Sequence, residues 1–99
     1  MRIAYSRRAL SQLASVYEYL SKRSPQAAQN VRTSIRATIA RLVHMPMLGK
    51  LTDEPGVHVL IEPEYLYRVF YRIDGEVVIV IRISHGSQMY AYSSSSRSS

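Results

Sequence analysis

The stretch YLYRVFYRIDGEVVIVIRISH, residues 65–85, decides how the rest of the chain folds. It holds two runs of apolar, β-branched and aromatic residues on either side of an Asp74-Gly75 dipeptide. Such runs around a strong turn dipeptide predict a β-hairpin. Because alternate side chains of a strand point to opposite faces, the odd positions form one nearly apolar face. The even positions form the other face, which carries Arg68, Arg72 and Arg82.

The length of the turn decides whether the apolar faces of the two strands coincide. A strict two-residue Asp-Gly loop would set the polar face of one strand beside the apolar face of the other. A three-residue loop, residues 74–76, pairs Tyr71 with Ile79 and brings Arg68 opposite Arg82. Since a one-residue slip moves every side chain to the wrong face, we predict a loop of odd length.

Length and composition exclude several classes of protein. The chain has 99 residues, enough for one hydrophobic core, and no cysteine, which excludes disulfides and thiolate metal sites. No apolar run approaches the ~20 residues that a membrane span needs. The N-terminal stretch MRIAYSRRALSQLASV lacks the uninterrupted apolar centre of a signal peptide. We therefore expect a cytoplasmic protein with no membrane partner.

The net charge of +6 is unevenly distributed along the chain. Residues 1–50 hold nine Lys or Arg and one Glu, a balance of +8, whereas residues 51–99 hold four Arg and six Asp or Glu, a balance of −2. A basic surface of this kind attracts polyanions, either nucleic acid or an acidic protein segment. Basic side chains that only solvate exposed helix faces explain the same charge equally well.

The first half of the chain predicts a strand followed by two helices. Residues 2–5 alternate as a short strand does, and Ser6 is the expected N-cap of a helix to about Arg23. Ser24-Pro25 then begins a second helix to about His44. Apolar residues at three- and four-residue spacing give each helix one buried stripe: Leu10, Leu13, Ala14, Tyr17 and Leu20 in the first, and Ala28, Val31, Ile35, Ile39 and Leu42 in the second.

A strand over residues 57–62 and the hairpin of residues 65–85 complete the order strand, helix, helix, strand, strand, strand. This order predicts an α+β fold of two layers, with the helical hairpin packed on one side of a small, mostly antiparallel sheet. Residues 1–88 form the single domain. Residues 89–99 form a serine-rich tail that we expect to be disordered.

The second side of the predicted sheet is left for solvent or a partner. Its candidate binding residues are Arg68, Phe70, Arg72 and Arg82 from the hairpin and His58 from the preceding strand. If Arg68 and Arg82 are cross-strand neighbours, they repel each other unless a carboxylate or phosphate lies between them. An acidic-partner site and simple solvation by Glu62 or Glu64 are both open explanations.

These segments together resemble the ParE/RelE superfamily of toxins from bacterial type II toxin–antitoxin systems. The resemblance covers residues 2–88 and rests on the segments RIAYSRRALSQL, LVHMPMLG, YRVFYRI and IVIRISHG. A Y-R-x-x-Y strand followed by a strand that ends R-x-x-H-G looks more like the ParE branch. The resemblance implies a cytoplasmic, growth-inhibiting toxin of the plasmid-stabilization kind, held inactive in a hetero-oligomer with an acidic antitoxin encoded beside it.

The two branches of the superfamily imply different activities. ParE-like members inhibit DNA gyrase without chemistry of their own, and no cofactor is implied. RelE-like members are ribonucleases that cut messenger RNA on the ribosome. By this resemblance Arg68 would contact the phosphate and His85 would be the acid–base group. Two departures weaken that assignment, since Ser87-Gln88 and His58 stand where RelE-like enzymes carry basic residues.

The leading prediction is therefore a ParE-like inhibitor of DNA gyrase. The second is a RelE-like, ribosome-dependent ribonuclease that uses Arg68 and His85. The third is a degenerate, non-toxic member that only binds its antitoxin, for which the missing basic residues are a reason. Metal binding is not predicted, because the histidines at positions 44, 58 and 85 share no ligand spacing.

Overall fold

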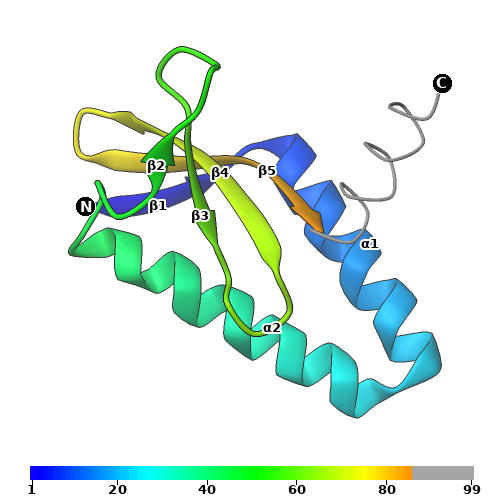
Figure 1. The fold of residues 1–99 in the computed structure, drawn as a ribbon. Helices are drawn as coiled ribbons and strands as arrows, with labels where there is room; N and C mark the ends of the chain where they lie inside the picture. Colours follow the sequence, from blue (N-terminus) through cyan, green and yellow to red (C-terminus); the bar gives the residue numbers. More distant parts are fainter. Residues whose placement is uncertain (86–99) are drawn as a thin grey trace, which may run out of the picture.

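The computed structural model describes residues 1–85, and its elements follow the predicted order (Figure 1). In chain order they are β1 (Arg2–Tyr5), α1 (Arg7–Arg23), α2 (Pro25–Ala40), the 3-10 turn η1 (Arg41–Val43), β2 (Lys50–Leu51), β3 (His58–Ile61), β4 (Tyr67–Asp74) and β5 (Val77–His85). The predicted α+β architecture is confirmed, with the two-residue strand β2 as an addition and with α2 giving way to η1 before His44. The predicted tail, residues 89–99, lies outside the described residues.

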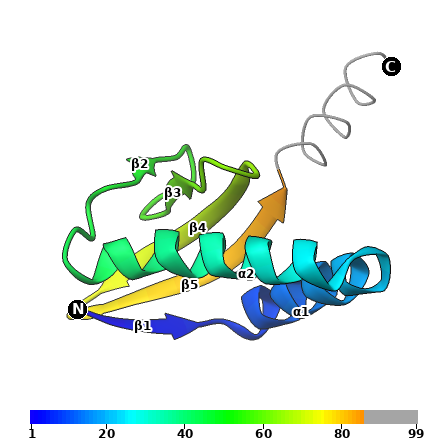
Figure 2. The same cartoon turned by 90° about the horizontal axis from the view of Figure 1, so that it is seen from below.

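The strands form one five-stranded sheet in the order β1-β5-β4-β3-β2. Strand β1 runs parallel to β5, and the other neighbours are antiparallel. Seen from below, α2 crosses in front of the strands, so that the helical hairpin covers one face of the sheet (Figure 2). The main core lies between these layers and joins residues of both helices to residues of β4 and β5: Ala9, Val31, Ile35, Ile39, Tyr67, Val69, Val80 and Ile83.

The two helices bury different amounts of their predicted stripes. In α2 the stripe is confirmed, and Val31, Ile35 and Ile39 are buried. In α1 the buried residue is Ala9, whereas Leu10 is 53% exposed and Ala14 is exposed, so the predicted stripe is wrong at these two positions. The first turn of α1 therefore faces the sheet through a small side chain. Within residues 1–85 neither helix combines the length and the apolarity that crossing a membrane requires.

The turn of the β4–β5 hairpin is shorter than predicted. Asp74 pairs with Val77, so the loop consists of two residues, Gly75 and Glu76. The predicted three-residue loop is therefore wrong. Gly75 has a φ of 61°, a conformation that residues with a side chain rarely adopt, and glycine relieves that strain in a tight hairpin turn.

A two-residue loop would set the polar face of one strand beside the apolar face of the other, and a β-bulge corrects this mismatch. The register of β4 and β5 shifts by one residue between Phe70 and Tyr71, which leaves Ile81 as the extra residue of β5. Before the bulge the even positions of β5 are buried, and after it the odd position Ile83 is buried. The prediction that all odd positions of β5 face the core is therefore right only beyond the bulge.

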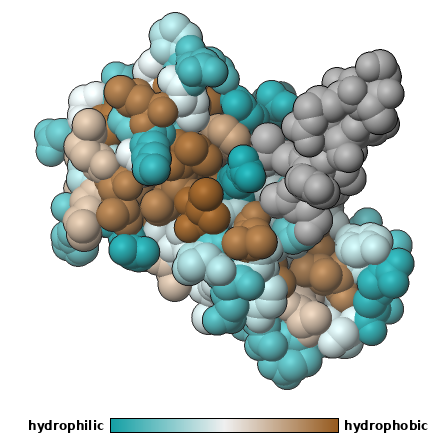
Figure 3. Space-filling view, viewed as in Figure 1, coloured by the Kyte–Doolittle hydropathy of each residue, from teal (hydrophilic) through white to brown (hydrophobic). Residues whose placement is uncertain are grey.

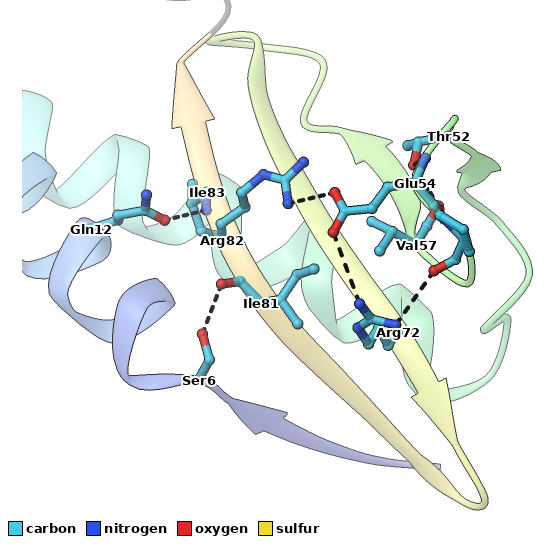
Figure 4. Close-up of polar contacts among 10 residues, drawn as sticks. Ser6, Gln12, Thr52, Glu54, Val57, Arg72, Ile81, Arg82 and Ile83 are labelled. Atoms are coloured by element: carbon cyan, nitrogen blue, oxygen red, sulfur yellow. Dashed lines mark hydrogen bonds and ion pairs between the residues drawn. The ribbon is translucent and has the colours of Figure 1, made fainter.

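Beyond the end of β1, residues at and near the start of α1 lie along the edge of β5 and bond to its backbone. Strand β1 ends at Tyr5, so the rest of β5 has no strand on that side. There the Ser6 hydroxyl donates a hydrogen bond to the carbonyl of Ile81, the bulge residue, at 2.8 Å (Figure 4). The side-chain oxygen of Gln12 accepts a hydrogen bond from the Ile83 N–H at 2.6 Å. These side chains satisfy backbone groups that an open strand edge would leave to water or to another chain.

Ser6 is expected to contribute more to stability than an ordinary helix cap. Its hydroxyl also accepts a hydrogen bond from the Ala9 N–H at 3.0 Å, and Ser24 caps α2 through the same kind of bond from the Ala27 N–H at 3.1 Å. We expect Ser24→Ala to cost about 1 kcal/mol of unfolding free energy and Ser6→Ala about 2 kcal/mol, because the bulge carbonyl also loses its donor. Urea denaturation measures both values. Equal losses would show that the bond to the bulge adds nothing.

The loop between η1 and β2 docks on a buried tyrosine. The Tyr71 hydroxyl donates a hydrogen bond to the Pro46 carbonyl at 2.7 Å and accepts one from the Gly49 N–H at 2.8 Å. Tyr71 is fully buried, and burial raises the pKa of its phenol above the ordinary value although the Gly49 N–H lowers it in part. The hydroxyl therefore keeps its proton at neutral pH and can serve as donor and acceptor at once.

A buried carboxylate organises the connection between β3 and β4. The Glu62 side chain is 0% exposed. It accepts hydrogen bonds from the Ser34 hydroxyl of α2 at 2.6 Å, from the Glu64 N–H at 2.7 Å and from the Tyr65 N–H at 2.9 Å. Burial by itself raises the pKa of Glu62, but these hydrogen bonds outweigh it and hold the pKa below the ordinary value. Glu62 thus joins the sheet to α2 and does not solvate the arginines of the hairpin.

Candidate functional site

The sheet face opposite the helices carries most of the predicted binding residues. We call it the outer face, and it consists of Val59 and Ile61 from β3, Arg68, Phe70 and Arg72 from β4, and Ile79 and Arg82 from β5. Strand alternation places these side chains together, because their neighbours along β4, Tyr67, Val69 and Tyr71, are buried in the core on the helix side. Four of the five predicted binding residues are therefore on one surface.

Arg82 lies over the ring of Phe70 at the centre of the outer face. The two residues are directly opposite each other across β4 and β5, and the guanidinium carbon is 4.0 Å from the ring centroid. Phe70 is only 7% exposed as a result. The bulge is the cause of this pairing, and the predicted pairing of Arg82 with Arg68 is wrong. A cation held over an aromatic ring has its charge free to meet an anion from the solvent side.

Glu54 joins two of the arginines of the outer face. It comes from the loop of residues 52–57, which we call the strap, and its carboxylate is 3.1 Å from Arg82 and 3.9 Å from Arg72 (Figure 4). The Arg72 guanidinium also donates a hydrogen bond to the Pro55 carbonyl of the strap at 3.4 Å. A carboxylate thus already lies between cations of neighbouring strands, but these are Arg72 and Arg82 and not the predicted pair, and the carboxylate comes from a residue that the sequence interpretation did not consider.

Arg68 is the outer-face arginine that no carboxylate of residues 1–85 contacts as an ion pair. It lies opposite Ile61 of β3 and Ser84 of β5, at the far end of the face from the strap. The predicted solvation of Arg68 by Glu62 is wrong, because Glu62 is buried in its own turn. Arg68 is consequently the residue of this face with most positive charge left for a partner.

His58 is not part of the outer face, and its predicted position there is wrong. It pairs with Tyr71 across β3 and β4, on the helix side, and the two rings stack with centroids 5.1 Å apart and planes at 15°. His58 is 7% exposed, and neither ring nitrogen has a hydrogen-bond partner among residues 1–85. The register of β3 decides its position, and alternation within β3 alone could not reveal which face is inner.

His85 also lies on the helix side, away from Arg68. Its ring is 4.6 Å from that of Tyr67, and both residues line an open pocket of about 690 Å³ that Val16 and Tyr19 of α1 also line. Arg68 pairs with Ser84, one residue before His85, so its side chain points to the other face. The two residues predicted for ribonuclease chemistry are therefore brought to the same end of the sheet but to opposite faces.

Hydrophobic residues surround the edge of the outer face. Figure 3 shows them gathered over β2, β3 and the neighbouring loops. Ile61, opposite Arg68, is 48% exposed, and Leu51 and Met47 near this edge of the sheet are 66% and 68% exposed. Apolar anchors next to cations suit a polypeptide partner that brings both leucine-like side chains and carboxylates.

Comparison with known proteins agrees with this architecture. The family described as the ParE toxin of type II toxin–antitoxin system, parDE, matches residues 3–90. The toxin RelE2 of Caulobacter vibrioides is 27% identical over 88 residues, which cover 89% of this chain and 98% of that toxin.

Solved toxin structures have the same fold. The chromosomal ParDE system of P. aeruginosa superposes with a TM-score of 0.75 at 23% identity, over 86% of this chain and 95% of that chain. The intact E. coli RelBE toxin–antitoxin complex superposes with a TM-score of 0.66 at 19% identity, over 86% of this chain and 95% of that chain. Since the family match spans most of the sequence, the chain belongs to the ParE toxin family of type II toxin–antitoxin systems, within the ParE/RelE superfamily.

Proposed function

We propose that the protein inhibits DNA gyrase and is neutralised by an acidic antitoxin that binds the outer face. The match of residues 3–90 to the ParE family supports gyrase as the target, because the resemblance implies that target for the ParE branch. The observation that carries the non-enzymatic form of the proposal is the placement of Arg68 and His85 on opposite faces of the sheet.

The antitoxin part of the proposal rests on the chemistry of the outer face. Arg68 has no carboxylate partner within residues 1–85, and Ile61 opposite it is half exposed. A segment that brings carboxylates and apolar side chains complements both features. Such a segment can order as it binds, either as an added strand or as a helix laid across the sheet. Two similar solved structures are described as a ParDE system and a RelBE toxin–antitoxin complex, which supports an antitoxin partner.

RelE-like cleavage of messenger RNA is the lower-ranked activity. It needs an acid, a base and cations around a single phosphate. Arg68 and His85 cannot meet at one phosphate while the sheet lies between them, and we assign no catalytic step to them. The name of the similar toxin RelE2 is a reason to include RNA cleavage in the test.

A supercoiling assay with purified gyrase and relaxed plasmid tests the proposal. We expect the toxin to block supercoiling at micromolar concentration or below, and the antitoxin encoded beside it to relieve the block. A translating extract with labelled messenger RNA runs in parallel, and we expect the RNA to stay intact. Unimpeded supercoiling together with RNA cleavage that His85→Ala abolishes would establish the ribonuclease instead. If the protein neither blocks supercoiling nor cleaves RNA but still binds the antitoxin, it is a non-toxic family member.

The same preparation tests the role of the outer face. In the double variant Arg68→Glu and Arg82→Glu we expect antitoxin affinity to fall by orders of magnitude, because two attractive contacts become repulsive. The matched control is Arg7→Glu with Arg8→Glu, which makes the same charge change on exposed residues of α1. Equal affinity of the two double variants would exclude the outer face as the antitoxin site.

A further inference from the structure

The anion site of the outer face is already occupied by a carboxylate of the chain itself. We infer that Glu54 is a built-in competitor, and that an acidic segment of a partner polypeptide replaces it on Arg72 and Arg82 when the partner binds. The inference rests on the proposed docking of an acidic partner on the outer face. It adds to that proposal by naming the group that binds Arg72 and Arg82 in the free protein. It also explains how the chain limits its own affinity for the partner.

The Glu54 carboxylate contacts the two arginines as an acidic ligand would. One carboxylate oxygen is 3.1 Å from an Arg82 nitrogen, and the other is 3.9 Å from an Arg72 nitrogen. In Figure 4 the carboxylate stands between the two guanidinium groups, which come from neighbouring strands. These are the two ion pairs that occur within residues 1–85, and both use Glu54. The site is thus demonstrably able to hold a carboxylate.

Hydrogen bonds within the strap itself help to position Glu54, in addition to the bond from Arg72 to the Pro55 carbonyl. The Thr52 N–H donates to the Val57 carbonyl at 2.9 Å, and the Val57 N–H donates to the Glu54 carbonyl at 3.0 Å. The Thr52 hydroxyl oxygen accepts a hydrogen bond from the Glu54 N–H at 3.1 Å. Gly56 provides the positive φ of 75° that closes the turn, and Val57 anchors it as a fully buried residue. The chain therefore presents this carboxylate from a preorganised loop.

The internal contacts are weak enough to exchange. The side chains of Glu54 and Arg72 are 45% and 48% exposed, and that of Arg82 is 25% exposed. Ion pairs with this exposure contribute little to stability, because water screens them. A partner that brings several carboxylates and buries Ile61 gains more binding free energy than the internal ion pairs provide, so its displacement of Glu54 is favourable. A weakly binding anion does not gain enough to displace Glu54.

The surroundings favour a polypeptide carboxylate over a nucleic-acid phosphate. The outer face carries a large exposed apolar side chain, Ile61, opposite Arg68, which a peptide with a leucine-like anchor can cover and a sugar–phosphate backbone cannot. The occupant that the structure contains is itself a carboxylate. We therefore assign the site to an acidic segment of a protein partner.

The test measures the affinity of the full chain for a fluorescein-labelled peptide of alternating glutamate and leucine, by fluorescence anisotropy. We expect Glu54→Gln to bind the peptide about three- to tenfold more tightly than the unaltered protein, because the competing carboxylate is neutralised while its shape is kept. The matched control is Asp53→Asn, which removes the same charge from the neighbouring residue of the strap, and we expect it to change the affinity by less than about twofold. Adding Arg82→Gln to Glu54→Gln should abolish the gain.

Equal effects of Glu54→Gln and Asp53→Asn would overturn the inference, because the gain would then be a general effect of net charge. Tighter binding of a labelled RNA oligonucleotide but not of the peptide would overturn it too, since the site would then be a phosphate site. A second variant, Thr52→Val, removes the side-chain bond that positions Glu54 and should tighten peptide binding in the same direction. The assay contains no gyrase and no antitoxin, so its failure and the failure of the proposed function are separate results.

Discussion

Replacing Glu62 by alanine is expected to lower the free energy of unfolding by about 3 kcal/mol. The carboxylate is the buried acceptor for the Ser34 hydroxyl and for the N–H groups of Glu64 and Tyr65. Alanine leaves these donors without an acceptor and leaves a cavity between α2 and the β3–β4 turn. Urea denaturation at neutral pH measures the loss.

Two further variants separate the hydrogen bonds from the charge. Glu62→Gln keeps one acceptor oxygen and should lose about half as much stability as Glu62→Ala, since charge-assisted hydrogen bonds are roughly twice as strong as neutral ones. Glu64→Gln removes a charge from the exposed neighbour and should stay within about 0.5 kcal/mol of the unaltered protein. Equal stability of all three variants would show that the Glu62 carboxylate has no structural role.

The same carboxylate predicts how stability depends on pH. Its pKa is lowered on folding, because hydrogen bonds to the charged form outweigh the cost of burial. The contribution of Glu62 is therefore fully present above its unfolded pKa and is lost as the pH falls through the lower, folded pKa. Thermal melts of the unaltered protein should fall in midpoint in acid below about pH 4.5, and those of Glu62→Gln should fall less. Parallel curves would contradict this assignment.

Gly49→Ala is expected to cost about 3 kcal/mol or more of unfolding free energy. A Cβ atom at Gly49 would lie 2.7 Å from the Val59 carbonyl oxygen and 2.7 Å from the Tyr71 hydroxyl. Neither group can move easily, because Val59 is in β3 and Tyr71 is fully buried. The added methyl group must push the loop away from the sheet and break the hydrogen bond from the Gly49 N–H.

Gly75→Ala is the matched control for this second prediction. Gly75 needs a positive φ of 61°, but a Cβ there meets no atom within 4 Å, so the cost is backbone strain of about 1 kcal/mol. Tyr71→Phe supplies the other comparison, because it removes the hydroxyl oxygen, one of the three atoms that the Gly49 methyl group would strike, and leaves the ring carbon Cε1 at 2.9 Å and the Val59 carbonyl oxygen. In a double-mutant cycle Gly49→Ala should cost less in the Tyr71→Phe background. Losses that simply add would show that the clash comes from the Val59 carbonyl and the ring of residue 71, and not from the hydroxyl.

The parts of the fold that the sequence predicted correctly depend on neighbouring residues. Ser6 and Ser24-Pro25 are local signals for the start of a helix, and the structure has helices beginning at Arg7 and Pro25. The hairpin of residues 65–85 follows from its turn dipeptide and its apolar runs. The same local alternation placed Arg68, Phe70 and Arg72 on one face, because β4 itself has no irregularity.

The parts that escaped prediction depend on contacts between distant segments. The bulge at Ile81 is supported by Ser6, 75 positions earlier in the chain, and its presence changes which positions of β5 are buried. The burial of Glu62 requires Ser34, 28 positions away. Glu54 looked like an ordinary residue of a polar turn, since its partners Arg72 and Arg82 come from two later strands. No periodic pattern along one segment contains such information.

The parallel pairing of β1 with β5 has a consequence for how the protein is made. Arg2 pairs with Val77, so β1, which is synthesised first, has no partner strand until β5 has been made. Contacts so far apart in sequence form late and slow folding, whereas the helical hairpin can form from local contacts as it emerges. A chain that ends before β5 lacks the core residues Val78, Val80 and Ile83 as well as the partner of β1. Truncated translation products that end before β5 therefore cannot build the sheet, and the fold forms only from a chain translated through residue 85.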